Sequence, residues 1–126
     1  KGGKGVGKVA KPGLPVAVGE DAIYPDSQAL IKENILELSR VMHFGSICQI
    51  SIIIEVPDGE RLARQALFHR IGIEGGIAIR ETPALSRLST PEAWQQYISQ
   101  SLQVARATEN RKIILAPGAA SERFAK

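Results

Sequence analysis

The sequence has little cysteine, few aromatic residues and no long apolar run. Its 126 residues include one cysteine, Cys48, and only 5% of them are aromatic. A single cysteine excludes an internal disulfide and a zinc site of several thiolates, so we expect a cytoplasmic protein with Cys48 as a small buried residue. The longest uncharged apolar run, residues 50–54, is far shorter than the roughly 20 residues that span a bilayer. The basic start leads into glycine and proline, so we expect neither a signal peptide nor a membrane partner.

Positive charge is concentrated at the start of the chain. Residues 1–11, here called the lysine arm, carry four lysines and no acidic residue, whereas residues 12–126 hold 12 basic and 13 acidic side chains. The net charge of +3 therefore comes from one cationic segment. This distribution favours an anionic small molecule as the partner. It argues against nucleic acid, which usually binds a broad basic face.

Hydrophobic periodicity predicts an α/β fold of mixed α+β character, in which helices pack on a mixed sheet that is parallel in part. Pro25-Asp26-Ser27 indicates a helix start capped by Asp26 or Ser27, with an apolar stripe that ends before Gly45. A second, short helix is expected from Glu60. A third should begin at Thr90-Pro91-Glu92 and run to about Thr108. We expect the second and third helices to bury the side chains of Leu62, Ala63, Ala66 and Leu67, and of Trp94, Ile98, Leu102 and Ala105, respectively.

Strands are predicted where the apolar period changes to two. Residues 47–56 alternate as a half-buried strand does, and residues 71–79, IGIEGGIAI, indicate a strand that glycines interrupt. Residues 112–116 form a short apolar run that ends at Pro117-Gly118, which favours a last strand. The glycine-rich opening, residues 1–21, is expected to be a structured region of loops and short strands.

Three familiar kinds of catalytic or binding motif are poorly supported. Gly2, Gly7 and Lys8 have the spacing of a phosphate-binding loop, but Val9 lacks the hydroxyl that binds the metal ion, and Pro12 would break the helix that must follow. A nucleotide-binding module is therefore the weakest alternative. His43 and His69 have no patterned nucleophile, and no metal-ligand spacing exists, so we predict no catalytic triad and no protein-held metal.

Glycines cluster in three places: residues 2–7, residues 72–76 and Gly118. Each place could simply be a tight turn. Alternatively, glycine leaves bare backbone that a ligand can approach, and the lysine arm beside the first cluster would suit a large polyanionic ligand. The residues alone leave both interpretations open.

Four segments resemble a known family in their order and spacing. They are GGKGVGKVAKPGLPVAVGEDAI, VPDGERLA, IGIEGGIAI and LAPGAASERFA. They resemble cobalt-precorrin-5B (C-1)-methyltransferase of the CbiD type, from anaerobic cobalamin biosynthesis. The resemblance runs over nearly the whole chain but covers a minority of the family's usual length. It implies that residues 1–110 are a CbiD-like domain that is incomplete at its amino terminus, and that residues 111–126 begin a second α/β domain.

The resemblance implies an enzyme that transfers a methyl group from S-adenosylmethionine to ring carbon 1 of a cobalt-containing tetrapyrrole. Its fold should differ from the common Rossmann-type methyltransferase. Cobalt would arrive within the anionic substrate, so the protein need not hold a metal. Transfer of a methyl group from a sulfonium to a ring carbon chiefly requires that the two reactants are aligned in a pocket that excludes water. A non-catalytic relative that binds a tetrapyrrole or another subunit stays as the alternative, and neither the oligomeric state nor a catalytic residue is predicted.

Site residues follow from the resemblance and the glycine pattern together. Acetate and propionate groups of the substrate would meet the lysine arm and Arg70, with the substrate-binding residues being Gly3, Lys4, Gly5, Gly7, Lys8, Lys11 and Arg70. Ribose hydroxyls of the methyl donor could donate to Glu74 or Glu20. The predicted cofactor-binding residues are Glu74, Gly75, Gly76, Thr82 and Gly118.

The chain departs from the usual family pattern in some loops. After Ile79 the family typically has Leu-Gly-Thr-Thr-Gly, where this chain has Arg80-Glu81-Thr82-Pro83-Ala84. Tyr24 and Phe68 stand where asparagine is usual, and Ala119-Ala120 replaces Gly-Arg. These departures fit a divergent or inactive relative, and they equally fit an enzyme with a changed substrate.

Overall fold

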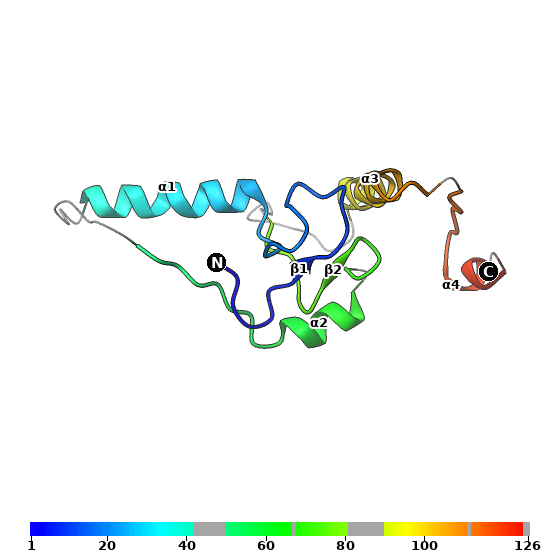
Figure 1. Ribbon diagram of the computed structural model, residues 1–126, viewed down its shortest axis with the longest axis horizontal. Helices are drawn as coiled ribbons and strands as arrows, with labels where there is room; N and C mark the ends of the chain where they lie inside the picture. Colours follow the sequence, from blue (N-terminus) through cyan, green and yellow to red (C-terminus); the bar gives the residue numbers. More distant parts are fainter. Residues whose placement is uncertain (42–49, 67, 81–89, 111, 125–126) are drawn as a thin grey trace.

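The computed structural model describes residues 1–41, 50–66, 68–80, 90–110 and 112–124. Its elements in chain order are β1 (Lys8–Val9), α1 (Pro25–Val41), α2 (Gly59–Gln65), β2 (Ile73–Glu74), α3 (Pro91–Ala107) and α4 (Ala119–Phe124). Strands β1 and β2 lie in the middle of the molecule, with α1 and α3 on one side and α2 on the other (Figure 1). The fold is a mixed α/β fold, as the periodicity predicts.

The sheet consists of one short ladder and several single bridges. β1 pairs with β2 in antiparallel register, with Lys8 opposite Glu74 and Val9 opposite Ile73. Isolated parallel bridges extend this ladder between Gly2 and Ile54, Val6 and Ile77, and Ile23 and Ile79. The predicted mixture of parallel and antiparallel pairing is thus present, although in shorter pieces than the apolar runs indicated.

The core forms where the glycine-rich opening meets the segment after α2. Val9 and Ile73, partners across the ladder, are each only 1% exposed. The buried cluster around them consists of Val9, Val16, Ala22, Tyr24, Ile71 and Ile73. Gly13 lets the opening segment pass directly beneath α3, because a Cβ atom there would lie 2.7 Å from the Gln103 carbonyl oxygen. Residues 1–24 are therefore a structured part of the core and not a linker, as predicted.

Helix α3 begins as the sequence predicts but buries a different face. The Thr90 hydroxyl accepts a hydrogen bond from the Ala93 amide at 3.2 Å, and Pro91 is the first helical residue. The expectation that Trp94, Ile98 and Leu102 are buried is wrong, since they are 54%, 47% and 42% exposed. Instead Val104 is buried and Tyr97 packs against the core. The Trp94 ring meets the Tyr97 ring edge-on, with centroids 6.3 Å apart, so the stripe is partly covered by the helix itself.

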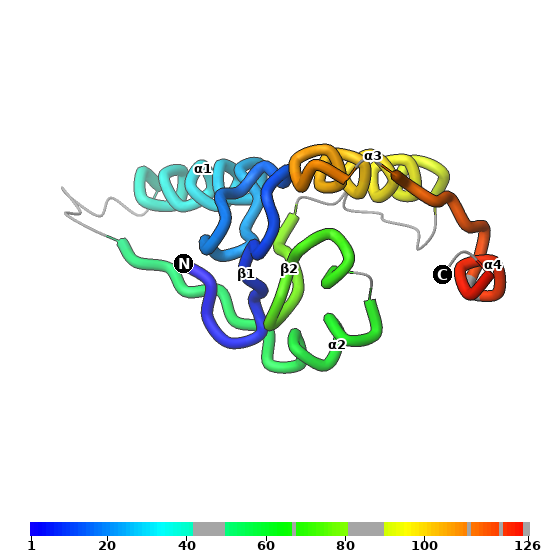
Figure 2. Tube along the Cα trace, turned by 45° about the vertical axis from the view of Figure 1, so that its right-hand side comes forward, coloured from blue at the N-terminus to red at the C-terminus, as the bar shows by residue number. Residues whose placement is uncertain are grey.

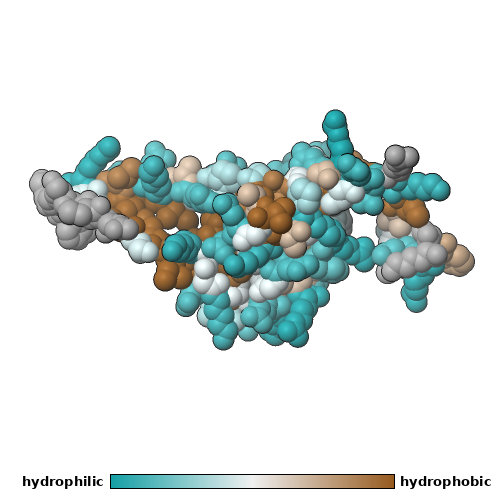
Figure 3. All heavy atoms as spheres, in the orientation of Figure 1, coloured by the Kyte–Doolittle hydropathy of each residue, from teal (hydrophilic) through white to brown (hydrophobic). Residues whose placement is uncertain are grey.

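Helix α1 also differs from the prediction at its start. It begins at Pro25, whose fixed φ suits the first helical position. Asp26 and Ser27 both lie inside the helix, so the predicted cap by either residue is wrong. Ser27 is buried, and its hydroxyl has no hydrogen-bond partner in the described part of the chain. Figure 3 shows apolar surface gathered along α1. Its exposed apolar residues are Leu30, Leu36, Leu38 and Val41.

Two predicted strands are reduced or missing. Of residues 50–56, only Ile54 forms a bridge, although Ile52, Ile54 and Val56 are less exposed than the residues between them, as the alternation predicts. Residues 112–116 form no strand; Ile113, Ile114 and Leu115 are exposed and meet no partner strand within the described ranges. Predictions for His43, Gly45, Cys48, Leu67 and the start of the strand at residues 47–49 lie outside the described residues.

Helix α2 is the predicted second helix and begins at Gly59, one residue before the expected start at Glu60. Ala63 and Ala66 are half-buried, but Leu62 is 39% exposed, so its predicted burial is wrong. The reason is that α2 turns the side with Glu60, Ala63 and Arg64 toward β2, because these residues line a hollow together with Ile73. Within the described residues, no helix is both long and apolar enough to cross a membrane.

Candidate functional site

The lysine arm and the IGIEGGIAI segment lie side by side. The Gly7 amide donates to the Ile77 carbonyl at 2.9 Å, the Ile77 amide donates to the Gly5 carbonyl at 3.1 Å, and the Ala10 amide donates to the Gly72 carbonyl at 2.7 Å. Figure 2 shows the same arrangement, with the blue opening segment against the green strand β2. The two glycine-rich segments that sequence analysis assigned to one site therefore do converge.

Three glycines in these segments, Gly5, Gly7 and Gly76, let the backbone approach itself. A Cβ atom on Gly76 would overlap the Gly5 carbonyl group and lie 2.6 Å from the Gly7 nitrogen. Gly59 faces Gly5 in the same way. Because backbone atoms cannot move aside as a side chain can, glycine is required at Gly5, Gly59 and Gly76 by packing alone. The interpretation of Gly5 and Gly76 as backbone left bare for a ligand is therefore unnecessary.

Gly75 is different, because it borders open space. Its φ is +74°, a conformation that favours glycine, and nothing lies within 4 Å of where its Cβ would be. Gly75 lies on the rim of a hollow of about 490 Å³ between α2 and β2, here called the α2–β2 pocket. The residues that line it are Glu60, Ala63, Arg64, His69, Ile73, Glu74, Gly75 and Gly76.

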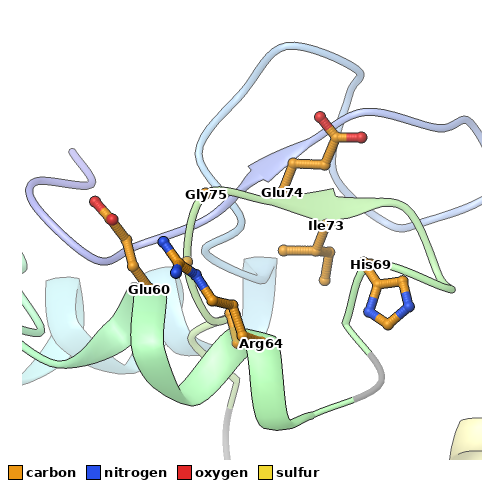
Figure 4. Close-up of a pocket in the computed structure, with 8 residues that line it drawn as sticks. Glu60, Arg64, His69, Ile73, Glu74 and Gly75 are labelled. Carbon is orange, nitrogen blue, oxygen red and sulfur yellow. The ribbon is translucent and has the colours of Figure 1, made fainter.

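The α2–β2 pocket has an apolar floor and charged walls (Figure 4). The Ile73 side chain points from β2 toward α2, while Glu60 and Arg64 rise from α2 toward the strand. His69 lies at the other end, beyond Ile73. Glu60, Arg64 and His69 are exposed, so their charges can contact a ligand without being buried first.

The Glu74 carboxylate does not point into the pocket. It points away from α2, on the opposite side of β2 from Ile73 (Figure 4). Its register partner across the antiparallel ladder is Lys8. Directly opposite residues of such a pair project from the same face of the sheet, so Glu74 and Lys8 share the face away from the pocket. Glu74 therefore lines the pocket without directing its carboxylate into it.

Arg64 and Glu60 have no ion-pair partner among the residues that the structure describes. By contrast, Arg61 on the same helix pairs with Asp58 at 3.4 Å, and Arg70 pairs with Glu122 at 3.1 Å. Arg64 and Glu60 are one helical turn apart, which places them on one face of α2. Both charges are therefore free to meet a ligand.

The other predicted site residues are dispersed. Lys4, Lys8 and Lys11 are exposed, and the stem of Lys11 covers Gly72. The Gly3 amide donates to the Ile54 carbonyl at 2.7 Å. None of the predicted substrate-binding residues lines the α2–β2 pocket. Glu20 and Gly118 are exposed away from that lining, and Thr82 lies outside the described residues.

Sequence analysis did not select Glu60, Arg64 or His69 as site residues. Glu60 stands in the VPDGERLA segment, whose Gly-Glu pair was quoted only for the family resemblance. Helical spacing from Glu60 leads to Arg64, which could have indicated a charged face on a short helix. Which side of α2 this face covers depends on its packing against β2, and the pattern of α2 alone does not give that.

A second polar contact joins the start of α1 to α3. The guanidinium carbon of Arg80 lies 5.3 Å from the centroid of the Tyr24 ring, and Arg80 Nη2 donates to Gln96 Oε1 at 3.0 Å. Burial raises the pKa of the Tyr24 phenol, and the positive charge of Arg80 and the Gln100 side chain partly offset this rise. The Tyr24 ring is thus held as a neutral phenol inside the core.

Comparisons with known proteins place the chain in a family. The CbiD family model matches residues 1–87. The cobalt-precorrin-5B C(1)-methyltransferase of Nitratidesulfovibrio vulgaris is 42% identical over 122 residues, which are 97% of this chain and 31% of that protein. The protein of the same name from Geobacillus kaustophilus is 40% identical over 124 residues, which are 98% of this chain and 33% of that protein.

A solved structure supports the same assignment. The cobalamin biosynthesis protein (cbiD) from Archaeoglobus fulgidus superposes with a TM-score of 0.52 at 27% identity, covering 98% of this chain and 38% of that one. The chain thus spans about a third of the length of the relatives that it matches. Since the family model covers more than half of the chain and both protein relatives align along almost all of it, the chain belongs to the CbiD family.

Proposed function

We propose that this chain forms part of an enzyme that methylates ring carbon 1 of a cobalt-precorrin in cobalamin biosynthesis, with S-adenosylmethionine as the methyl donor. The names of the relatives support the reaction and the substrate class. The observation that carries the proposal is the meeting of the lysine arm with the IGIEGGIAI segment, beside the α2–β2 pocket.

The substrate side of the proposal depends on charge. A cobalt-precorrin carries several acetate and propionate groups around a flat ring, so it is a large polyanion. Lys4, Lys8 and Lys11 are exposed, and no ion pair occupies them among the described residues. Arg70 is less suited, because it already binds Glu122 at 3.1 Å. We therefore assign the substrate carboxylates chiefly to the lysine arm.

The donor side depends on shape. The α2–β2 pocket, at about 490 Å³, falls within the roughly 300–1,000 Å³ of small-molecule sites. The open space at Gly75 lets a ligand approach the strand closely, and the half-buried Ala63 gives a small apolar surface, since Ile73 beneath it is only 1% exposed. These features fit S-adenosylmethionine, which combines charged ends with a largely apolar body. Of the predicted cofactor residues, Gly75 has the best-supported role.

The reaction requires little general acid–base catalysis by the protein. When bound, S-adenosylmethionine supplies a methyl group on a positively charged sulfur. A carbon–carbon bond forms to the ring as the methyl–sulfur bond breaks, and the bonding electron pair stays on sulfur. The chain's own residues have to bind and orient both molecules, which itself contributes a large rate factor. A protein that only has to bind and orient its two ligands needs charged binding residues and accessible backbone, which this site has.

The proposal is tested by incubating the purified protein with methyl-labelled S-adenosylmethionine and cobalt-precorrin-5B. The expected result is one label on the macrocycle and an equal amount of S-adenosylhomocysteine. Binding of both ligands without any transfer of the label would favour the alternative, a non-catalytic relative that binds a tetrapyrrole. This alternative stays open because the chain departs from the family pattern in the loop that begins at Arg80, whose side chain lies against Tyr24.

A nucleotide-binding module gains no support. Lys8 of the near-match to a phosphate-binding loop lies in β1, and β1 leads into bends, not into a helix. That loop needs the helix so that its amide groups and dipole face the phosphates. We therefore set this alternative aside.

A further inference from the structure

The α2–β2 pocket carries one acidic and one basic side chain that no other described residue occupies. Both side chains, Glu60 and Arg64, line the pocket and rise from α2 near the Gly75 end of β2 (Figure 4). The other charged residues nearby differ in this respect: Asp58 and Arg61 pair with each other. Two free charges of opposite sign, one helical turn apart, form a dipolar surface that suits a ligand with a carboxylate and an ammonium group.

Arg64 is suited to the carboxylate. A guanidinium group has five N–H donors in a planar fork, no acceptor, and a charge that persists at all ordinary pH values. Two parallel hydrogen bonds to a carboxylate are its preferred contact and are stronger than bonds between neutral groups. In Figure 4 the Arg64 guanidinium points toward the Gly75 end of β2, where no Cβ atom fills the space.

Glu60 is suited to the ammonium group. Its carboxylate is an acceptor only, so it complements an –NH₃⁺ group and repels an anion. Residues four apart on a helix have Cβ atoms about 5–6 Å apart. One α-amino acid group, with its two charges on the same carbon, can bridge that distance and contact both side chains. Ala63, which is half-buried and lines the pocket between them, would then meet the apolar part of the same ligand.

We propose that the α2–β2 pocket binds the α-amino-acid end of S-adenosylmethionine, with Arg64 binding its carboxylate and Glu60 binding its ammonium group. This inference rests on the proposed function, because it names the end of the methyl donor that the pocket recognises. It adds α2 to the donor's position, for which the sequence predicted Glu74, Gly75, Gly76, Thr82 and Gly118. The lysine arm, whose exposed lysines do not line the pocket, is left for the substrate.

The experiment compares two ligands in three forms of the purified protein. S-adenosylhomocysteine has the amino-acid end, and 5′-methylthioadenosine has the same adenosine and a thioether but lacks that end. Binding is measured by isothermal titration for the wild type, Arg64→Ala and the control Arg61→Ala. Arg61 lies on the same helix but binds Asp58 and does not line the pocket.

The expected result is selective. Arg64→Ala weakens S-adenosylhomocysteine binding roughly 10- to 100-fold, the loss typical of hydrogen bonds to a charged group, and leaves 5′-methylthioadenosine binding within about twofold. Arg61→Ala changes neither affinity. Glu60→Gln, tested in the same way, also weakens only the ligand with the amino group. Circular dichroism confirms that each variant keeps the wild-type fold.

Each of the other outcomes overturns either this inference or the proposed dependence on S-adenosylmethionine. Unchanged S-adenosylhomocysteine binding in Arg64→Ala would overturn this inference and leave the proposed function standing. If a folded Arg64→Ala variant lost affinity equally for both ligands, this would also overturn the inference, because Arg64 would not be binding the amino-acid end. A wild-type protein that binds neither ligand would overturn S-adenosylmethionine dependence, and the pocket assignment with it.

Discussion

Arg80 lies over the face of Tyr24, with its guanidinium carbon 5.3 Å from the ring centroid. The two residues stand at positions where the resemblance to the family leads us to expect leucine and asparagine. Two departures from the family pattern are therefore in contact. A guanidinium over an aromatic face is attractive, and a hydrogen bond to Gln96 at 3.0 Å holds the same group. Tyr24 lies just before α1 and Gln96 lies in α3, so Arg80 connects the start of α1 to α3. The two departures from the family pattern thus form one polar contact.

Replacing Arg80 should therefore destabilise the fold. Arg80→Ala removes both the contact with Tyr24 and the bond to Gln96, and we expect it to lower the free energy of unfolding by about 1–2 kcal/mol. Arg64→Ala is the matched control, since Arg64 has no such partner in the described part of the chain, and should change it by less than about 0.5 kcal/mol. Urea denaturation of both variants measures this. Equal effects would show that the Arg80 contact contributes nothing specific.

Tyr24 should make stability depend on alkaline pH. Burial raises the pKa of its phenol, with Arg80 and Gln100 partly offsetting the rise, so the folded state favours the neutral form. Its contribution is fully present below the unfolded pKa of about 10 and is lost as pH rises through the higher folded value. Tyr24→Phe should therefore flatten the decline in stability above about pH 10. Thermal melts from pH 8 to 11 test it, and parallel curves for the two proteins would refute the prediction.

Sequence analysis located the two segments of the site but not the pocket. The placement of glycines among β-branched residues indicated that the lysine arm and residues 71–79 have special backbones, and they do pair. A glycine pattern alone does not say what approaches the bare backbone. At Gly76 it is the Gly5 carbonyl group of the same chain, while at Gly75 it is open space. That difference arises from tertiary packing.

Helix ends were predicted better than helix faces. The Thr90-Pro91 start of α3 depends on hydrogen bonds within four residues, so local sequence determines it. The buried side of α3 depends on which neighbour it meets. Here Gly13 brings the opening segment against Val104, and the stripe that includes Trp94 stays exposed. Amphipathic spacing predicts that a face will be covered, but not by which part of a protein.

The packing role of Gly76 can be separated from a ligand role. Gly76→Ala would place a methyl group against the backbone of Gly5 and Gly7, and we expect it to cost about 3 kcal/mol or more. Gly118→Ala has nothing within 4 Å and should cost at most about 1 kcal/mol, through the start of α4. Both are measured by chemical denaturation without ligand. A Gly76→Ala protein as stable as the wild type would mean that these backbones can move apart.

The lysine arm should bind substrate through charge. Lys4→Glu combined with Lys8→Glu reverses two exposed charges, and we expect roughly tenfold weaker binding of an anionic cobalt-tetrapyrrole, as two modest surface ion interactions would give. The affinity of the variant should also depend less on salt, because fewer charge contacts remain to be screened. Lys32→Glu combined with Lys112→Glu makes the same change in net charge at exposed positions outside the lysine arm.

Comparing the two double variants separates local contact from overall charge. If the arm contacts the macrocycle, the Lys32 and Lys112 variant keeps nearly wild-type affinity and the wild-type salt dependence, while the Lys4 and Lys8 variant loses both. Equal weakening in the two proteins would mean that only net charge matters, and it would remove the lysine arm from the site. Because neither Lys4 nor Lys8 lines the α2–β2 pocket, S-adenosylhomocysteine binding should be unchanged in both, which confines any effect to the substrate.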